Sequence, residues 1–223
     1  MTLIQYILAI LPGIFICLYV IRSDKYEPEP MSALLLSFVL GTLLIIPAVA
    51  LGRLIAWNSS SIVQTFYQCF IQVAFIEEGL KLTLLLLLFY KRPYFNEPLD
   101  GIIYAVMIGM GFATAENLLF AGKHPWFFYV QRACTAQLAH AAFSIIQGFY
   151  IGQARFAANK PKRNRYLLIA WVTSWALHGA YDLFLQISPL TWVTLFSIII
   201  LIISAVLAFR FIHIQAAKPP GEQ

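Results

Sequence analysis

Residues 32–57 read SALLLSFVLGTLLIIPAVALGRLIAW, a stretch in which Arg53 is the only charged side chain. A helix needs about 20 mostly apolar residues to cross the hydrocarbon core of a bilayer, so this stretch predicts a transmembrane helix. Runs of the same kind recur along the chain. They predict seven spans, at residues 3–21, 32–57, 62–90, 98–122, 126–154, 166–187 and 190–212.

The composition extends this prediction to the whole chain of 223 residues. Hydrophobic residues make up 61% of it and charged residues 11%, whereas about a quarter of a soluble domain is charged. The apolar runs leave no room for a separate soluble domain. We therefore predict a single all-α, polytopic domain over residues 1–223, located in the cell membrane. The net charge of +5 then reports on orientation and lipid contact, and we predict no nucleic-acid binding.

The basic residues predict how the spans are oriented. Most of them fall on one side of the predicted membrane, in the connections around Arg22, Lys91 and Arg163. Cytoplasmic loops carry an excess of Lys and Arg. We therefore expect the N-terminus outside and the C-terminus in the cytoplasm.

The three cysteines lie inside apolar runs, without the spacing of a disulfide framework or a thiolate metal site. They are Cys17, Cys69 and Cys134. We expect them to be small, buried hydrophobic residues.

Four consecutive spans contain polar groups that lipid disfavours. Charged side chains at mid-membrane are costly, so those present are expected to face a bundle interior or a water-filled cavity and to have a function. With about 1.5 Å of rise per residue, their depths fall between the middle of the membrane and its outer leaflet, and we predict one shared site there. Its candidate residues are Glu77, Glu78 and Lys81, then Glu116 and Asn117, then His140, and finally His178 and Asp182.

The helical spacing of these residues favours a shared cavity. His178 and Asp182 are four residues apart and lie on one face. Glu77 and Lys81 have the same spacing, so the lysine is expected to neutralise a carboxylate within its own span. Glu78 is turned about 100° from Glu77. We expect one glutamate to act in the chemistry and the other to be bonded structurally.

Two further patterns would bring the polar groups into the bundle. Small residues at every fourth position permit close helix approach one turn before Glu116. They are Gly101, Ala105, Gly109 and Ala113. A polar stripe follows one face of the span 126–154, at Gln137, His140, Ser144 and Gln147. Asp100 is predicted to be a helix-start residue outside the site.

The candidate residues suit peptide hydrolysis, which needs an activated water, a base and a group that stabilises the oxyanion. Glu77 or Glu78 is the predicted base, and Glu116 is a third carboxylate for the same chemistry. In a mechanism without metal, the glutamate activates water while the two histidines and Asn117 donate to the oxyanion.

A mechanism with metal can be drawn equally well. Two imidazoles and a carboxylate form a ligand set for Zn²⁺, with a position left open for water. His140 and His178 would supply the imidazoles, and either Asp182 or Glu116 the carboxylate. The sequence leaves both mechanisms open.

Four motifs follow one another in order along the chain. They are Glu77-Glu78-Gly79-Leu80-Lys81, Phe112-x3-Glu116-Asn117, His140 and His178-x3-Asp182, preceded by the loop Tyr26-Glu27-Pro28-Glu29-Pro30. This order resembles the PrsW family of bacterial intramembrane proteases over essentially the whole chain. The resemblance implies a site-1-type protease that cleaves a single-span, membrane-anchored anti-sigma factor on its extracytoplasmic side and starts release of a stress-response sigma factor. The PrsW family is in turn similar to CAAX prenyl endoproteases and to the Aph-1 scaffold subunit of gamma-secretase.

Two other classes of function are open at the level of sequence. A noncatalytic membrane scaffold would tolerate Glu77→Gln or Glu78→Gln. A proton-coupled transporter would use the same buried carboxylates and histidines, but transporters usually show an internal repeat with interrupted helices. The two halves of this sequence show no convincing similarity.

Overall fold

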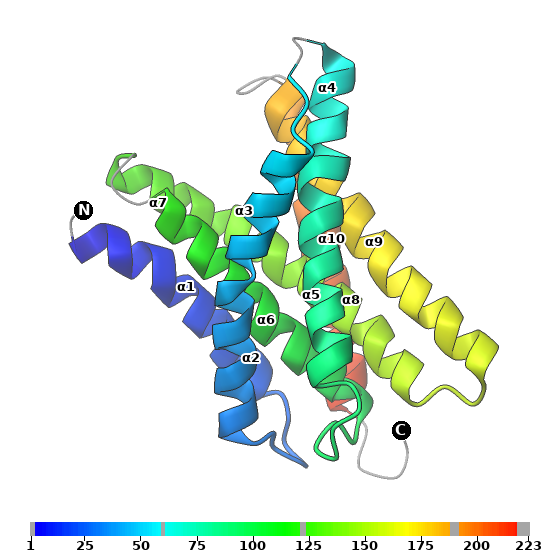
Figure 1. The fold of residues 1–223 in the computed structure, drawn as a ribbon. Coiled ribbons are helices and arrows are strands. Elements are labelled where there is room, and N and C mark those ends of the chain that lie inside the picture. Colours follow the sequence, from blue (N-terminus) through cyan, green and yellow to red (C-terminus); the bar gives the residue numbers. More distant parts are fainter. Residues whose placement is uncertain (1–2, 59–60, 121–123, 188–191, 218–223) are drawn as a thin grey trace.

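The computed structural model describes residues 3–58, 61–120, 124–187 and 192–217, and the chain there is helical with short connections (Figure 1). The elements are α1 (Leu3–Ile21), α2 (Met31–Leu43), α3 (Ile45–Leu54), α4 (Ile62–Tyr67), the π-helix η1 (Gln68–Phe75), α5 (Ile76–Leu88), α6 (Pro98–Leu119), α7 (Trp126–Cys134), α8 (Ala136–Arg155), α9 (Lys160–Ile187) and α10 (Thr194–Ala216). Within the described residues, four segments are long and apolar enough to cross a membrane: Leu3–Ile21, Met31–Leu54, Pro98–Leu119 and Thr194–Ala216. The protein is an all-α, polytopic membrane protein.

Several predicted spans differ in their bounds. The span 32–57 breaks at Leu44 between α2 and α3, because Pro47 has no backbone N–H and its ring would clash with the carbonyl of Leu43. The span 126–154 is not one helix, because Thr135 has non-helical dihedral angles (φ −128°, ψ −77°) between α7 and α8. α9 begins at Lys160, before the predicted 166, so the basic residues lie on its first turns. Residues 121–122 and 190–191 of the predicted spans lie outside the described residues.

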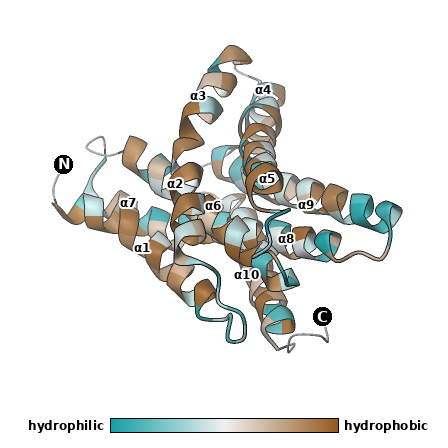
Figure 2. Ribbon diagram, turned by 60° about the horizontal axis from the view of Figure 1, so that its bottom comes forward, coloured by the Kyte–Doolittle hydropathy of each residue, from teal (hydrophilic) through white to brown (hydrophobic). Residues whose placement is uncertain are grey.

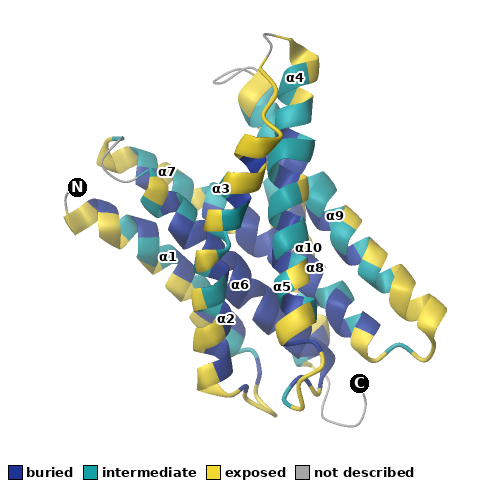
Figure 3. Cartoon of the chain, viewed as in Figure 1, coloured by how far each residue is buried: buried dark blue, intermediate teal, exposed yellow. Residues whose placement is uncertain are grey.

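α6 forms the centre of the bundle. Every residue from Pro98 to Ala115 is buried, and Figure 3 shows this helix dark blue among more exposed neighbours. A Cβ on Gly101 would overlap the backbone of Gly148 in α8, and a Cβ on Gly109 would overlap Ser144. The predicted row of small residues therefore forms the face on which α6 and α8 approach closely.

The first turn of α6 is held by a capping box. Asp100 Oδ2 accepts a hydrogen bond from the backbone N–H of Glu97 at 2.8 Å, and the Glu97 side chain accepts one from the backbone N–H of Asp100. Pro98 occupies the first turn, where its missing N–H costs little. The prediction that Asp100 starts a helix is confirmed.

The outside of the bundle is apolar. Figure 2 shows hydrophobic residues along the helices, with hydrophilic residues on the loop after α1 and at the start of α9. Large side chains point outward, for example Phe15, Leu87 and Val206, which are 65%, 75% and 62% exposed. Apolar side chains suit contact with lipid. The helices also satisfy their own backbone hydrogen bonds, as a bilayer requires.

The cysteines are free thiols. Cys17 and Cys69 are buried as predicted, but Cys134 is exposed. The prediction was wrong for Cys134. This residue is the last one of α7, a short helix that buries Tyr129 and leaves Cys134 on its exposed side.

Candidate active site

The site lies where η1 passes into α5. A π-helix is wider than an α-helix and occurs frequently at functional sites. Glu77 and Glu78 occupy the first turn of α5, directly after η1, and Lys81 follows on the next turn. Trp175 of α9 donates from its indole N–H to the carbonyl of Phe70 in η1 at 2.7 Å. This contact fixes the π segment against α9.

Glu78 is completely buried, and its contacts are made through one oxygen, Oε1, while Oε2 has no hydrogen-bond partner. Its Oε1 accepts from Lys81 Nζ at 2.7 Å and lies 2.9 Å from His178 Nδ1. Lys81 Nζ also lies 3.2 Å from Nδ1 of His140. Glu77 Oε2 is 3.9 Å from the same ammonium, so the nearer carboxylate partner of Lys81 is Glu78, one residue from the one expected.

Glu77 faces a cavity of about 80 Å³ that His140 and His178 also line. One carboxylate oxygen of Glu77 and one ring nitrogen of each histidine all lie within 4.8 Å of one another. Glu77 Oε2 is buried and has no hydrogen-bond partner. The structure thus brings together three predicted site residues from α5, α8 and α9.

Asp182 lines the same cavity. Its Oδ2 lies 3.4 Å from Nε2 of His178, one turn earlier on α9. The predicted shared face of these two residues is therefore observed. His178 lies between two carboxylates, with Glu78 at Nδ1 and Asp182 at Nε2.

Glu116 is held by a residue that sequence reasoning did not assign to the site. Arg132 of α7 forms an ion pair with it, with 2.9 Å between Nη2 and Oε2, and donates from Nε to Asn117 Oδ1 at 2.6 Å. His140 Nε2 lies 3.1 Å from the same oxygen of Glu116. The guanidinium also lies over the ring of Phe120 at 4.7 Å. An arginine inside a predicted span was the signal that could have identified Arg132.

The residues of the polar stripe on α8 have different roles. Gln147 donates to Ser174 Oγ at 2.8 Å and so joins α8 to α9 below the cavity. Gln137 donates to the carbonyl of Ala9 in α1 at 3.0 Å. These two glutamines hold helices together, whereas His140 of the same stripe lines the cavity.

Comparison with known proteins decides the family. Residues 29–209 match the family described as PrsW family intramembrane metalloprotease. The chain belongs to the PrsW family. Protease PrsW of Bacillus subtilis (strain 168) is 35% identical over 176 residues, covering 79% of this chain and 80% of that protein. Protease PrsW of Clostridioides difficile (strain 630) is 34% identical over 210 residues, covering 91% and 87%. No solved structure shows a significant match to this chain.

As a member of the PrsW family, the protein is an intramembrane metalloprotease, and the prediction of a protease is confirmed. The chemistry of the cavity fits a metal. A carboxylate and two imidazoles are donors typical of catalytic zinc sites. The buried Oε2 of Glu77 adds an acceptor that no protein donor occupies.

Proposed function

We propose that this PrsW family member cleaves a membrane-anchored, single-span anti-sigma factor near its extracytoplasmic side, and that this cut starts release of a stress-response sigma factor. The observation that carries the proposal is the meeting of Glu77, His140 and His178 around one cavity. The substrate class rests on the resemblance to the family. The side of the membrane rests on the distribution of Lys and Arg, which favours an external N-terminus.

His140, His178 and Asp182 would hold the metal ion. Ligands of a tetrahedral Zn²⁺ with bonds of about 2.0–2.1 Å lie about 3.4 Å apart, and Asp182 Oδ2 is 3.4 Å from His178 Nε2. Zn²⁺, when bound, would act as a Lewis acid and make a water molecule easier to deprotonate. Glu78 holds the other ring nitrogen of His178 and so fixes the orientation of the ring.

Glu77 is the proposed base. Its Oε2 is free of hydrogen bonds, so it can accept the proton of the attacking water and pass it to the departing amine. The other two carboxylates are less available as proton acceptors. Glu78 also has an oxygen without a donor, but it is paired with Lys81 at 2.7 Å and does not line the cavity, and Glu116 is paired with Arg132.

A second cavity supports access from the lipid. It measures about 200 Å³, opens between α3 and η1, and shares Val73 and Glu77 with the active-site cavity. Gln72 donates to the carbonyl of Gly52 at 3.0 Å and joins the two walls. A substrate segment in this cleft would reach Glu77 without passing through the core of the bundle.

The test is cleavage of a tagged, single-span anti-sigma factor by the purified enzyme in detergent. Glu77→Gln and Glu78→Gln are assayed beside the wild type, with chelator and with zinc added back. We expect cleavage to disappear in Glu77→Gln and after chelation, and to return with zinc. Cleavage that resists the chelator would contradict the need for a metal ion and favour the glutamate mechanism without metal. No cleavage in detergent or in lipid would contradict the proposed substrate.

A further inference from the structure

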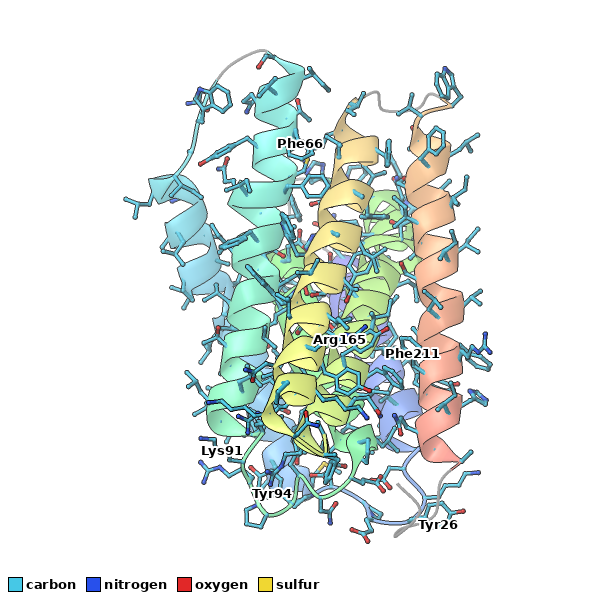
Figure 4. All side chains as sticks on the ribbon, turned by 90° about the vertical axis from the view of Figure 1, so that its right-hand side faces the viewer. Tyr26, Phe66, Lys91, Tyr94, Arg165 and Phe211 are labelled. Carbon is cyan, nitrogen blue, oxygen red and sulfur yellow. The ribbon has the colours of Figure 1, made fainter. Side chains whose placement is uncertain are left out.

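Acidic residues gather at the end of the bundle away from the active site. They come from the loop after α1, the loop before α6 and the first turn of α6: Asp24, Glu27, Glu29, Glu97 and Asp100. Figure 4 shows Tyr26 and Tyr94, one from each loop, both at this end of the bundle, and Phe66 toward the other end. Asp100 and Glu116 lie about 24 Å apart along α6, so the two clusters of carboxylates are separate.

Three of these carboxylates are buried and close together. One oxygen from each of Asp24, Glu97 and Asp100 lies within 4.8 Å of the others. Asp100 is completely buried, and Asp24 is 7% exposed. The buried carboxyl of Glu29 lies against Asp100 and accepts a hydrogen bond from the hydroxyl of Tyr104.

Two oxygens of the cluster, one on Asp24 and one on Asp100, are buried without a donor. Across the parts of the chain that the structure describes, no lysine or arginine forms an ion pair with Asp24, Glu29 or Asp100. Asp100 Oδ2 accepts from the backbone N–H of Asn96 and of Glu97, but its Oδ1 is buried and accepts from no donor. Asp24 Oδ2 is buried without a donor as well. Burial raises the pKa of Asp24 and of Glu29, and the carboxylate of Asp24 adds to the rise in Glu29.

Buried carboxylates that face one another repel when both are charged, and either a shared proton or a cation between them relieves the repulsion. We propose that Asp24, Glu97 and Asp100, with Glu29 beside them, bind a divalent cation of the Mg²⁺ or Ca²⁺ type. Such hard cations take oxygen ligands. Ca²⁺–oxygen bonds of about 2.3–2.6 Å place opposite ligands about 5 Å apart, which accommodates oxygens that lie within 4.8 Å of one another.

The ion would join the loop after α1 to the start of α6. α6 carries Glu116 near its other end, so the site would stabilise the helix on which part of the active site is built. The proposal does not depend on the protease substrate or on the metal of the active site.

Thermal unfolding of the purified protein tests the proposed cation site. The protein is stripped with chelator in detergent, and MgCl₂ or CaCl₂ is added separately, with NaCl at matched ionic strength as the reference. We expect one or both cations to raise Tm by about 5 °C at saturation. Asp24→Asn and Asp100→Asn should abolish this rise. Asparagine keeps an oxygen that can cap α6, and if Asp100→Asn does not fold, Asp24→Asn carries the test.

Two matched variants serve as controls. Glu27→Gln removes an exposed carboxylate of the same loop, and His178→Ala alters the active site. Both should keep the rise in Tm. A wild type that responds to neither cation, or an Asp24→Asn variant that responds like Glu27→Gln, would overturn the proposal.

Discussion

Arg132 Nη2 lies 2.9 Å from Glu116 Oε2, and this ion pair joins the short helix α7 to the end of α6 beside the active-site cavity. The same guanidinium donates to Asn117 at 2.6 Å. A guanidinium can make both contacts because its donors lie in a rigid planar fork, whereas a lysine ammonium is a compact charge on a flexible stem. Arg132 is therefore a positioning residue for Glu116 and Asn117.

Replacing Arg132 tests this role. We expect Arg132→Gln to lower kcat by about 10–100-fold with a smaller change in KM, because Glu116 loses its orientation while the cavity stays open. Arg132→Lys should be intermediate. Steady-state cleavage rates measure both variants, with Arg163→Gln on the exposed start of α9 as the control. Full activity in Arg132→Gln would contradict the role.

The two adjacent glutamates should differ in their effect on stability. Glu78→Gln leaves the buried ammonium of Lys81 without its close carboxylate partner, and we expect the free energy of unfolding to fall by about 3–5 kcal/mol. Glu77→Gln breaks no hydrogen bond of Oε2, so its cost should be about 1 kcal/mol or less. Denaturant unfolding in detergent measures both. Equal losses in the two variants would argue against Glu78 as the bonded glutamate.

Metal content should separate ligands from the base. We expect Asp182→Asn and His178→Ala to lower zinc affinity at least about tenfold, whereas Glu77→Gln should retain zinc and lose cleavage. Elemental analysis of the purified variants after dialysis gives bound zinc per chain. Loss of zinc from Glu77→Gln would instead make Glu77 a ligand, in keeping with its place beside His140 and His178.

The cleft between α3 and η1 can be narrowed from its α3 wall, without replacing a residue of the active-site cavity. Ala48 is buried and lines the cleft, so Ala48→Phe should raise KM for a membrane-embedded substrate several-fold, roughly as expected for about 1 kcal/mol of lost binding. Leu51→Phe, at an exposed position of the same helix, is the matched control. Unfolding curves verify that both variants fold. Equal KM values in the two variants would show that substrate reaches the site by another route.

Much of the site could be predicted before any helix was placed. Lipid makes an isolated charge so costly that Glu77, Glu116 or His178 in an apolar run must face a cavity or a partner, whichever helices surround it. The small residues of α6 likewise predicted a close helix contact, because only the absence of side chains lets two backbones approach. These inferences depend on one helix at a time.

The membrane class, the approximate spans and the polar residues that need an interior all follow from the order of residues, because each depends on the cost of transferring a segment into lipid. The packing of the helices was needed to show that Glu77 lines the cavity while Glu78 is bonded, that Arg132 reaches Glu116, and that Asp24 lies beside Asp100. Those pairings join different helices and loops. Their geometry depends on how the helices pack, which the spacing of residues along a single helix does not specify.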